Sequence, residues 1–410
     1  MKVAIIAALY RHGWGYQETF WIQQLKQDGH QVRVLCPAKN TSLERFETTF
    51  GPYEVLHVAT LALPHSLFLS DQVAPALYEY KPDLVMWHGP SMFFGRCLVK
   101  DPNLAQVPVV SFWGEHLGMH EFDWRKKGLT FKQRLHAIVW RVLRGRMMRA
   151  ALFRSQVIVG NTPQTKDILR LPFGASPRWA EIEPKYMQKT LGFLRHNFHW
   201  DPPLRQRIRE ELGMGPDDIV ACFSSRFDAG PKARDIATAI GGIQEAMRRQ
   251  PDLKAMVIGF SDNATSEQFR RTIASGPGAD RIACHSFANL VRLNELYNAS
   301  DIALFPNATI SAQATMGTGL YVCLADNGAM GHLITHADQG VYFRPDDPGA
   351  LGEKIAAAVD KFKQMSPPQR AEYRAHLAEE SRWMSYDQIL SDVMRRLEQV
   401  AGGHNQPART

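Results

Sequence analysis

The stretch IVACFSSRFDAGPKARDIATAIGGIQEAM (219–247) decides the fold of the second half of the chain. It begins as an apolar strand, continues as a loop with glycine and basic residues, and ends as an amphipathic helix. A second stretch, IALFPNATISAQATMGTGLYVCLADNGAMGHLI (302–334), predicts a strand, a helix of small residues, another strand, a glycine-containing loop and another helix. Strands that are apolar throughout and alternate with helices indicate a parallel sheet that helices cover on both faces.

The same alternation runs through the whole chain. In the first half, apolar runs predict strands at 3–9, 31–37, 53–59, 84–89, 107–113 and 157–161. In the second half they predict strands at 219–225, 253–260, 281–287, 302–307, 321–326 and 340–345, and helices at 235–248, 289–300, 348–363, 367–380 and 386–399. We therefore expect an α/β protein with two doubly wound, Rossmann-like domains that face each other across a cleft. Ligands of such sheets bind beyond the carboxyl ends of the strands.

At 410 residues the chain is too long for one ordinary core. The stretch 172–203, with several prolines, aromatic residues and mixed charge, breaks the alternation, and we interpret it as the connection between the domains. The predicted domains are 1–195 and 196–370, followed by C-terminal helices at 371–400 that cross back to the first domain. Residues 401–410 are expected to form a flexible tail.

The bulk composition limits the kind of protein. A net charge of +7 and a pI of about 9.1 favour anionic partners. Five cysteines are scattered along the chain, and three lie in apolar strands, so we expect buried free thiols in a reducing compartment. These three are Cys36, Cys222 and Cys323. The apolar run at 3–9 fits a buried strand better than a signal peptide, and no run reaches the roughly 20 apolar residues that span a bilayer. We expect a cytoplasmic protein.

Arg226 and Lys232 lie between the strand at 219–225 and a helix that starts near Asp235. Cations beside a helix N-terminus bind phosphate through charge-assisted hydrogen bonds and the helix dipole. Such a site can neutralise a leaving diphosphate without a metal ion. A solvated basic loop explains the same residues, and this motif alone does not decide between the two.

Two loops of the first half carry further candidates. Gly15 lies between the first strand and the first helix, where glycine lets the backbone approach a ligand, although a plain turn also explains it. His116 follows a buried strand and is a candidate to orient or deprotonate a hydroxyl group, with an ordinary loop histidine as the alternative. His120 lies near Glu115 and Glu121, but the spacing matches no metal motif, so we assign no metal site.

The loops Asn307–Gly319 and Asp326–Gly331 are small, polar and rich in glycine. Helix N-termini in both are expected to point at a common ligand. Ser311 and Gln313 supply neutral hydrogen-bonding groups there, and no carboxylate accompanies them.

Residues 125–154 contain ten lysines or arginines and no acidic residue. Six apolar residues of this segment fall on one helical face: Leu135, Ile138, Val139, Val142, Leu143 and Met147. Either this face packs on the sheet of its own domain, or it rests on an anionic membrane surface. No nucleic-acid interface is expected, because no stacking aromatic residues interleave with the basic ones.

In their order and spacing these segments resemble the GT-B glycosyltransferases, close to the retaining family 4 (group 1) enzymes, over roughly residues 1–400. MKVAIIAALY and GYQETFWIQQLKQDGHQVRVLCP resemble the family's opening strand, glycine loop, helix and second strand. ELGMGPDDIVACFSSR, ELYNASDIALFP, MGTGLYVCLADNGAMGHLI and GVYFRPDDPGALGEKI then follow in the family's order.

The resemblance implies a nucleotide-diphosphate sugar as donor substrate, no further cofactor, and a hydroxyl group on a glycan or lipid-linked acceptor. It implies that Arg226 and Lys232 stabilise the leaving diphosphate and that His116 is the family's cleft histidine, which makes these three the predicted catalytic residues. It implies donor-binding roles for positions in the glycine loops and the small-residue helix. These are Gly15, Ser311, Gln313, Ala314, Asn327, Gly328, Ala329 and Met330.

One departure from the family's pattern bears on activity. The family usually carries two glutamates around its small-residue helix, whereas no glutamate occurs here between Glu295 and Glu353. The second of them, which holds the nucleotide ribose, falls at Ala314, and His332 stands where a glutamate is common. Losing that carboxylate removes a charge-assisted hydrogen bond of about 1.5–3 kcal/mol.

The sequence thus supports two hypotheses. In the first, the protein is a retaining, metal-independent hexosyltransferase of surface polysaccharide or glycolipid assembly, cytoplasmic and in peripheral contact with the inner face of the membrane. In the second, a glycosyltransferase-like protein with weak or no turnover binds a sugar or a partner. A sugar epimerase or phosphorylase of the same fold is a weaker third option, because no catalytic carboxylate or cofactor-binding lysine stands out.

Overall fold

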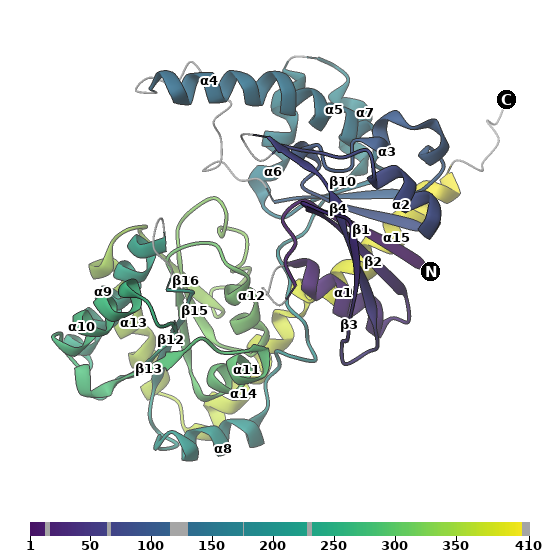
Figure 1. Cartoon of the computed structure of the whole chain (residues 1–410). Coiled ribbons are helices and arrows are strands. Elements are labelled where there is room, and N and C mark those ends of the chain that lie inside the picture. Colours follow the sequence, from purple (N-terminus) through teal and green to yellow (C-terminus); the bar gives the residue numbers. More distant parts are fainter. Residues whose placement is uncertain (13–16, 64–66, 115–129, 175, 228–231, 404–410) are drawn as a thin grey trace. The chain divides into compact units, whose positions relative to one another are not determined.

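The structure is a computed structural model that describes residues 1–12, 17–63, 67–114, 130–174, 176–227 and 232–403. The chain forms two compact units, coloured along the sequence in Figure 1. The first unit contains Met1–Thr190 and Ile389–Thr410, and the second contains Leu191–Gln388.

An eight-stranded sheet forms the centre of the first unit in its described part. The strands are β1 (Lys2–Ala7), β2 (Gln31–Ala38), β3 (Ser42–Phe46), β4 (Tyr53–Ala59), β7 (Leu84–His88), β8 (Val109–Trp113), β9 (Val157–Gly160) and β10 (Tyr186–Gln188). Their order is β10-β9-β8-β7-β1-β2-β4-β3, and every neighbouring pair is parallel except β3 with β4. The six strands predicted for this half are confirmed.

Helices and a short hairpin complete the first unit. The helices are α1 (Gln17–Gln27), α2 (Val73–Tyr80), α3 (Cys97–Lys100), α4 (Phe131–Val139), α5 (Gly145–Arg154), α6 (Pro163–Arg170), α7 (Trp179–Ile182) and most of α15 (Tyr386–Gly403). The hairpin pairs β5 (Leu61–Leu63) with β6 (Leu67–Leu69).

The stretch 172–203 is more than a connection between domains. Residues 186–188 form β10, which pairs in parallel with β9 at the edge of the first sheet. A strand of three residues at an edge is too short to show either an apolar run or an alternation, so the sequence pattern missed it.

The basic segment 125–154 forms α4, a π-helical turn (Trp140–Arg144) and α5 in its described part. Four of the apolar side chains that were expected on one face are 43–51% exposed: Leu135, Ile138, Val142 and Leu143. Met147, in α5, is buried. The expectation that the whole face packs on its own sheet is therefore wrong. A π-helical turn inserts one residue into the helical repeat, so the faces of α4 and α5 do not continue each other.

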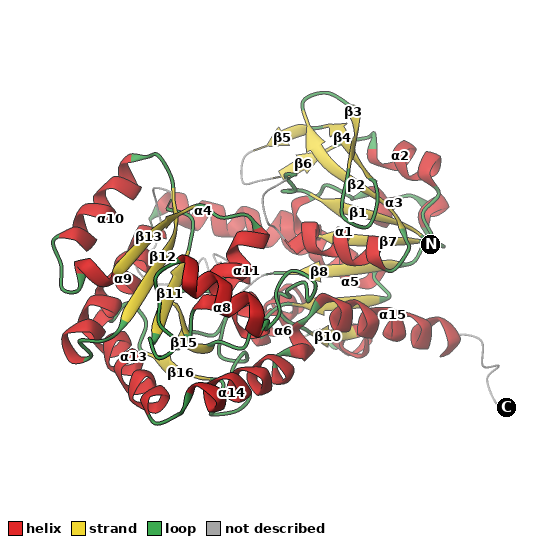
Figure 2. Cartoon of the chain, turned by 90° about the horizontal axis from the view of Figure 1, so that it is seen from below, coloured by secondary structure: helices red, strands yellow, loops and turns green. Residues whose placement is uncertain are grey.

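The second unit has a six-stranded parallel sheet of order β13-β12-β11-β14-β15-β16 among the described residues. Its strands are β11 (Val220–Ser224), β12 (Lys254–Phe260), β13 (Ile282–Ser286), β14 (Ile302–Phe305), β15 (Tyr321–Ala325) and β16 (Gly340–Phe343). Its helices are α8 (Pro202–Glu211), α9 (Lys232–Arg249), α10 (Ala264–Ala274), α11 (Leu290–Ala299), α12 (Ile310–Gly317), α13 (Pro348–Lys363) and α14 (Pro367–Glu380). Figure 2 shows α9, α10 and α13 on one face of this sheet and α8 and α11 on the other.

One element predicted for this unit is absent. The segment that follows β15 forms hydrogen-bonded turns rather than the expected helix. The hydroxyl of Tyr342 donates to the carbonyl oxygen of Met330 at 3.2 Å and accepts from the amide of Ile334 at 3.2 Å. These are the backbone groups that a helix would have paired, so the tyrosine holds the segment in a turn.

All five cysteines lie in the described part of the chain and are free thiols. Those predicted to be buried, Cys36, Cys222 and Cys323, are buried. Among the described helices, none combines the length and apolar character needed to cross a bilayer.

Candidate functional site

The candidate site of the second unit lies at the edge of the sheet where its parallel strands end. β11, β14 and β15 are neighbours, so the loops that leave their carboxyl ends emerge side by side. Arg226 is half-buried two residues after β11, and Lys232 is the exposed first residue of α9. The structure thus brings both predicted cations to this edge, at the N-terminus of an 18-residue helix.

The loop after β14 is tied to the first turn of α9. The side-chain amide of Asn307 donates to Asp235 Oδ2 at 3.2 Å. Burial raises the pKa of Asp235, and the hydrogen bond from Asn307 opposes that rise. This contact ties the loop that leads into α12 to the first turn of α9, the helix that begins at Lys232.

Helix α12 carries three predicted donor-binding positions. Thr309 caps its N-terminus by accepting a hydrogen bond from the amide of Ser311 at 3.3 Å, and Ser311 itself is half-buried. Gln313 is 4% exposed, and Ala314, at 1% exposed, belongs to the apolar core of the unit. A methyl group therefore occupies the position at which the family's pattern has a ribose-binding carboxylate.

The loop after β15 holds the remaining predicted positions. Asn327 Oδ1 accepts from the amides of Ala329 and Met330, both at 3.1 Å, and the carbonyl oxygen of Asn327 accepts from the amide of Gly331 at 3.0 Å. Met330 is buried, and Gly328 is exposed at the tip. In this conformation the backbone amides of Ala329, Met330 and Gly331 all donate hydrogen bonds to Asn327 within the turn.

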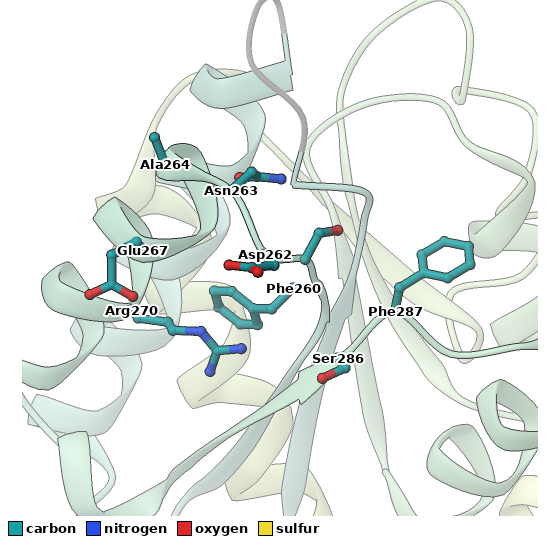
Figure 3. A pocket seen from close by; sticks show the side chains of 9 residues that line it. Phe260, Asp262, Asn263, Ala264, Glu267, Arg270, Ser286 and Phe287 are labelled. Atoms are coloured by element: carbon teal, nitrogen blue, oxygen red, sulfur yellow. The ribbon is translucent and has the colours of Figure 1, made fainter.

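A pocket of about 650 Å³ opens at the ends of β12 and β13, next to the Arg226 loop. Figure 3 shows Asp262 and Arg270 on the α10 side of this pocket and Phe287, 62% exposed, projecting beyond the end of β13. Asn263 joins the pocket to that loop, because its side-chain amide donates to the carbonyl oxygen of Phe227 at 3.1 Å. The sequence did not predict this pocket, because it forms only where β12, β13 and the start of α10 come together.

The first unit holds a polar network at the corresponding edge of its own sheet. His88, the last residue of β7, bonds through Nδ1 to Glu18 Oε1 and through Nε2 to the side-chain amide of Gln17 at 2.7 Å. Asn161, which follows β9, donates to Gln17 Oε1 at 3.1 Å. The network links the N-terminus of α1 to the ends of two strands, and no sequence pattern predicted it.

Glu18 is the buried member of this network, at 2% exposed. Burial alone raises the pKa of its carboxyl group, but the attraction and hydrogen bond of the His88 imidazole bring the pKa below its ordinary value. An imidazole oriented by a buried carboxylate is suited to hold a hydroxyl group or to move a proton. The predicted residues Gly15 and His116, and the pair of His120 and Glu121, lie outside the described residues.

Two family models match the chain. Residues 21–184 match the model described as Glycosyltransferase Family 4, and residues 205–380 match Glycosyl transferases group 1. The chain belongs to the group 1 glycosyltransferases. Each model falls within one of the two compact units, so the glycosyltransferase contains both halves of the family's architecture. No curated protein sequence matches this glycosyltransferase.

Solved structures confirm the fold. Sucrose-phosphate synthase from Thermosynechococcus elongatus is 13% identical, with a TM-score of 0.66 over 98% of this chain and 99% of the other. HepE from Anabaena, in complex with UDP and glucose, is 15% identical, with a TM-score of 0.58 over 98% and 99% of the two chains. WaaG, a glycosyltransferase involved in lipopolysaccharide biosynthesis, is 16% identical, with a TM-score of 0.61 over 95% and 99%. The fold of this glycosyltransferase is GT-B.

Proposed function

We propose that the protein transfers a hexose-type sugar from a nucleotide-diphosphate donor to a hydroxyl group of a glycan or lipid-linked acceptor. The family assignment supports sugar transfer, and the similar HepE structure contains UDP and glucose. The observation that carries the proposal is the position of Arg226 and Lys232 on the two sides of the β11–α9 loop, at the carboxyl edge of the sheet.

In this proposal the two cations and the α9 dipole stabilise the charge that develops on the leaving diphosphate. Because side chains supply this stabilisation, the reaction needs no metal ion. We also propose, as a separate point, that the transferred sugar keeps its anomeric configuration. Ser311 and Gln313 contact the donor. Two residues of the N-terminal half complete the proposal. Gly15 approaches the phosphates of the donor, and His116 orients the reacting hydroxyl group of the acceptor.

The nucleoside end of the donor is proposed to occupy the pocket of Figure 3. The pocket lies next to the Arg226 loop through the Asn263–Phe227 hydrogen bond, so a diphosphate on Arg226 directs its nucleoside toward Phe287. An exposed aromatic ring stacks on a base with about 1–3 kcal/mol. Phe287→Ala should therefore raise the KM for the donor by roughly fivefold or more, with a smaller effect on kcat.

The test is sugar transfer, or donor hydrolysis, with UDP-, GDP-, ADP- and dTDP-sugars. Activity should survive EDTA, and Arg226→Ala or Lys232→Ala should lower kcat by roughly 100-fold or more, because each removes a charge-assisted contact to the transition state. Arg234→Ala is the matched control, since Arg234 lies in the same first turn, is exposed and pairs with Asp346 at 3.5 Å. A requirement for a divalent metal with every donor would end the proposal.

A second candidate function follows from Ala314. Its methyl group lies in the apolar core of the second unit and supplies no polar contact to a ribose. We propose as the alternative that the protein keeps the glycosyltransferase fold with weak or no turnover and binds a sugar or a partner. No product from any of the four donors, together with no heat of binding from UDP, GDP, ADP or dTDP, would favour this alternative.

We further propose that α4 rests on an anionic membrane where the acceptor is presented, in surface polysaccharide or glycolipid assembly on the cytoplasmic side. Phe131 is 84% exposed and Leu135 51% exposed, next to the exposed cations Lys132 and Arg134. Apolar side chains flanked by cations are typical of helices that lie in the membrane interface.

The membrane proposal has its own test. Vesicles with phosphatidylglycerol should sediment the protein and vesicles of phosphatidylcholine alone should not, and salt should weaken the binding. Leu135→Ser with Ile138→Ser should abolish sedimentation. Leu43→Ser is the control, because Leu43 is a leucine of similar exposure, 49%, on β3. Equal binding to both kinds of vesicle would contradict the proposal.

A further inference from the structure

A pocket of about 420 Å³ lies in the second unit between α8 and α14. Four arginines line it, two from each helix: Arg205, Arg209, Arg370 and Arg374. The two helices open with the same spacing of residue types, PPLRQRIR (202–209) and PPQRAEYR (367–374). Arginines four residues apart lie on one face of a helix, so each helix presents a pair of guanidinium groups to the same space.

This pocket is separate from the candidate donor site. Arg205 Nη2 and Arg209 Nη2 bind the two carboxylate oxygens of Asp301, at 2.6 Å and 2.7 Å. Asp301 directly precedes β14, whereas the donor loops follow the carboxyl ends of the strands. The arginine pocket is therefore at the amino-terminal edge of the sheet, the edge opposite to Arg226.

Positive charge is in excess around the pocket. Four guanidinium groups face two carboxylates, the buried Asp301 and the exposed Glu210. Arg374 is 1% exposed, and its burial, together with the neighbouring charge of Arg205, lowers its pKa well below the ordinary value. Backbone carbonyl oxygens accept from these arginines, as Ser300 O does from Arg374 Nη1 at 2.6 Å, but carbonyl groups carry no net charge.

Donors remain for a ligand in the pocket. Arg205 Nε and Arg370 Nη2 have no hydrogen-bond partner among the described residues. Trp200 adds an apolar wall, with its ring 4.0 Å from Arg374 Cζ. Met214 also lines the space. The pocket thus joins guanidinium donors to an apolar surface.

We propose that this pocket binds a small phosphate monoester. A phosphate monoester carries close to two negative charges at neutral pH, which offsets the excess of two positive charges. Its phosphate oxygens accept from Arg205 and Arg370, and its carbon skeleton lies against Trp200. The proposal goes beyond sugar transfer, because it assigns a second ligand to the opposite edge of the sheet.

The test is titration calorimetry of the full chain with inorganic phosphate and with glycerol 3-phosphate, at constant ionic strength, with glycerol as the uncharged control. Arg226→Ala provides the background that removes the donor site, and saturable binding should persist in it. Gln206→Glu places a new carboxylate on the exposed rim of the pocket and should raise Kd by roughly fivefold, while Glu210→Gln should lower Kd by a similar factor.

Matched charge changes outside the pocket separate a local effect from a general one. Glu211→Gln, one residue along α8, and Gln268→Glu, an exposed position on α10, should leave Kd unchanged. No saturable binding by the native protein would overturn the proposal. So would binding that is lost in Arg226→Ala, or binding that responds equally to Gln206→Glu and Gln268→Glu.

Discussion

Asp301→Asn removes the one buried negative charge of the arginine cluster without changing the size of the side chain. Asp301 has no exposed surface. Its Oδ1 lies 2.6 Å from Arg205 Nη2, and its Oδ2 lies 2.7 Å from Arg209 Nη2 and accepts from the amide of Val220 at 2.9 Å. The substitution therefore leaves two guanidinium groups without their counter-charge at the start of the central strand β14.

The size of the effect follows from this geometry. Burial raises the pKa of Asp301, but Arg205, Arg209 and Arg374 bring it below the ordinary value, so the carboxylate is ionised in the folded protein. Removing one partner of a buried ion pair costs about 3–5 kcal/mol, which is a large part of the roughly 5–15 kcal/mol that stabilises a domain. In a unit of about 200 residues, each kcal/mol lowers Tm by about 2–4 °C, so we expect a fall of roughly 6–20 °C.

The assay is thermal unfolding of the full chain, measured by calorimetry and circular dichroism. Asp346→Asn is the matched control, because Asp346 forms an exposed pair with Arg234 in the same unit and should change the free energy of unfolding by less than about 0.5 kcal/mol. If Asp301→Asn also changed it by less than about 1 kcal/mol, the argument from buried charge would be refuted.

Two further predictions concern single residues. Because the folded-state pKa of Glu18 is lowered, its contribution to stability is present above about pH 4.5 and is lost as the pH falls through the folded-state value. Glu18→Gln should therefore flatten the loss of stability on acidification, measured by urea unfolding between neutral pH and about pH 2; parallel curves for the two proteins below about pH 4.5 would contradict this. Gly319 has a φ of +74°, and a Cβ there would lie 2.2 Å from the carbonyl oxygen of Arg374, so Gly319→Ala should cost roughly 2 kcal/mol or more. Gly213→Ala, with a φ of +66° and open space around the Cβ, should cost only about 1 kcal/mol, and equal costs would show that the contact with α14 does not matter.

The sequence predicted the strands that form longer apolar runs and missed strands that are short or exposed. β1 and β11 are continuous apolar runs, because helices cover both sides of each sheet. β3 is almost fully exposed and carries charged residues, and β10 has only three residues, so neither has a pattern that distinguishes it from a loop. The helix expected after β15 was wrong because the hydroxyl of Tyr342, which lies beyond the segment in the next strand, β16, binds the backbone groups that the helix would have paired.

The same distinction applies to the site. Arg226 and Lys232 could be found because both belong to one local pattern of strand, loop and helix. His88 and Glu18 are 70 positions apart, and only the fold of the first sheet brings the imidazole to the carboxylate. The pocket near Phe287 likewise needs two strands and α10 to be in place, so composition and spacing give little sign of it.

The most direct measurement of the central claim is calorimetric titration of UDP, GDP, ADP and dTDP into the native protein and into the Arg226→Ala, Lys232→Ala double variant. If both cations hold a diphosphate, at least one nucleotide binds the native protein. Losing two charge-assisted contacts should then weaken that nucleotide by roughly 100-fold or more. Equal affinity for the two proteins would contradict the account.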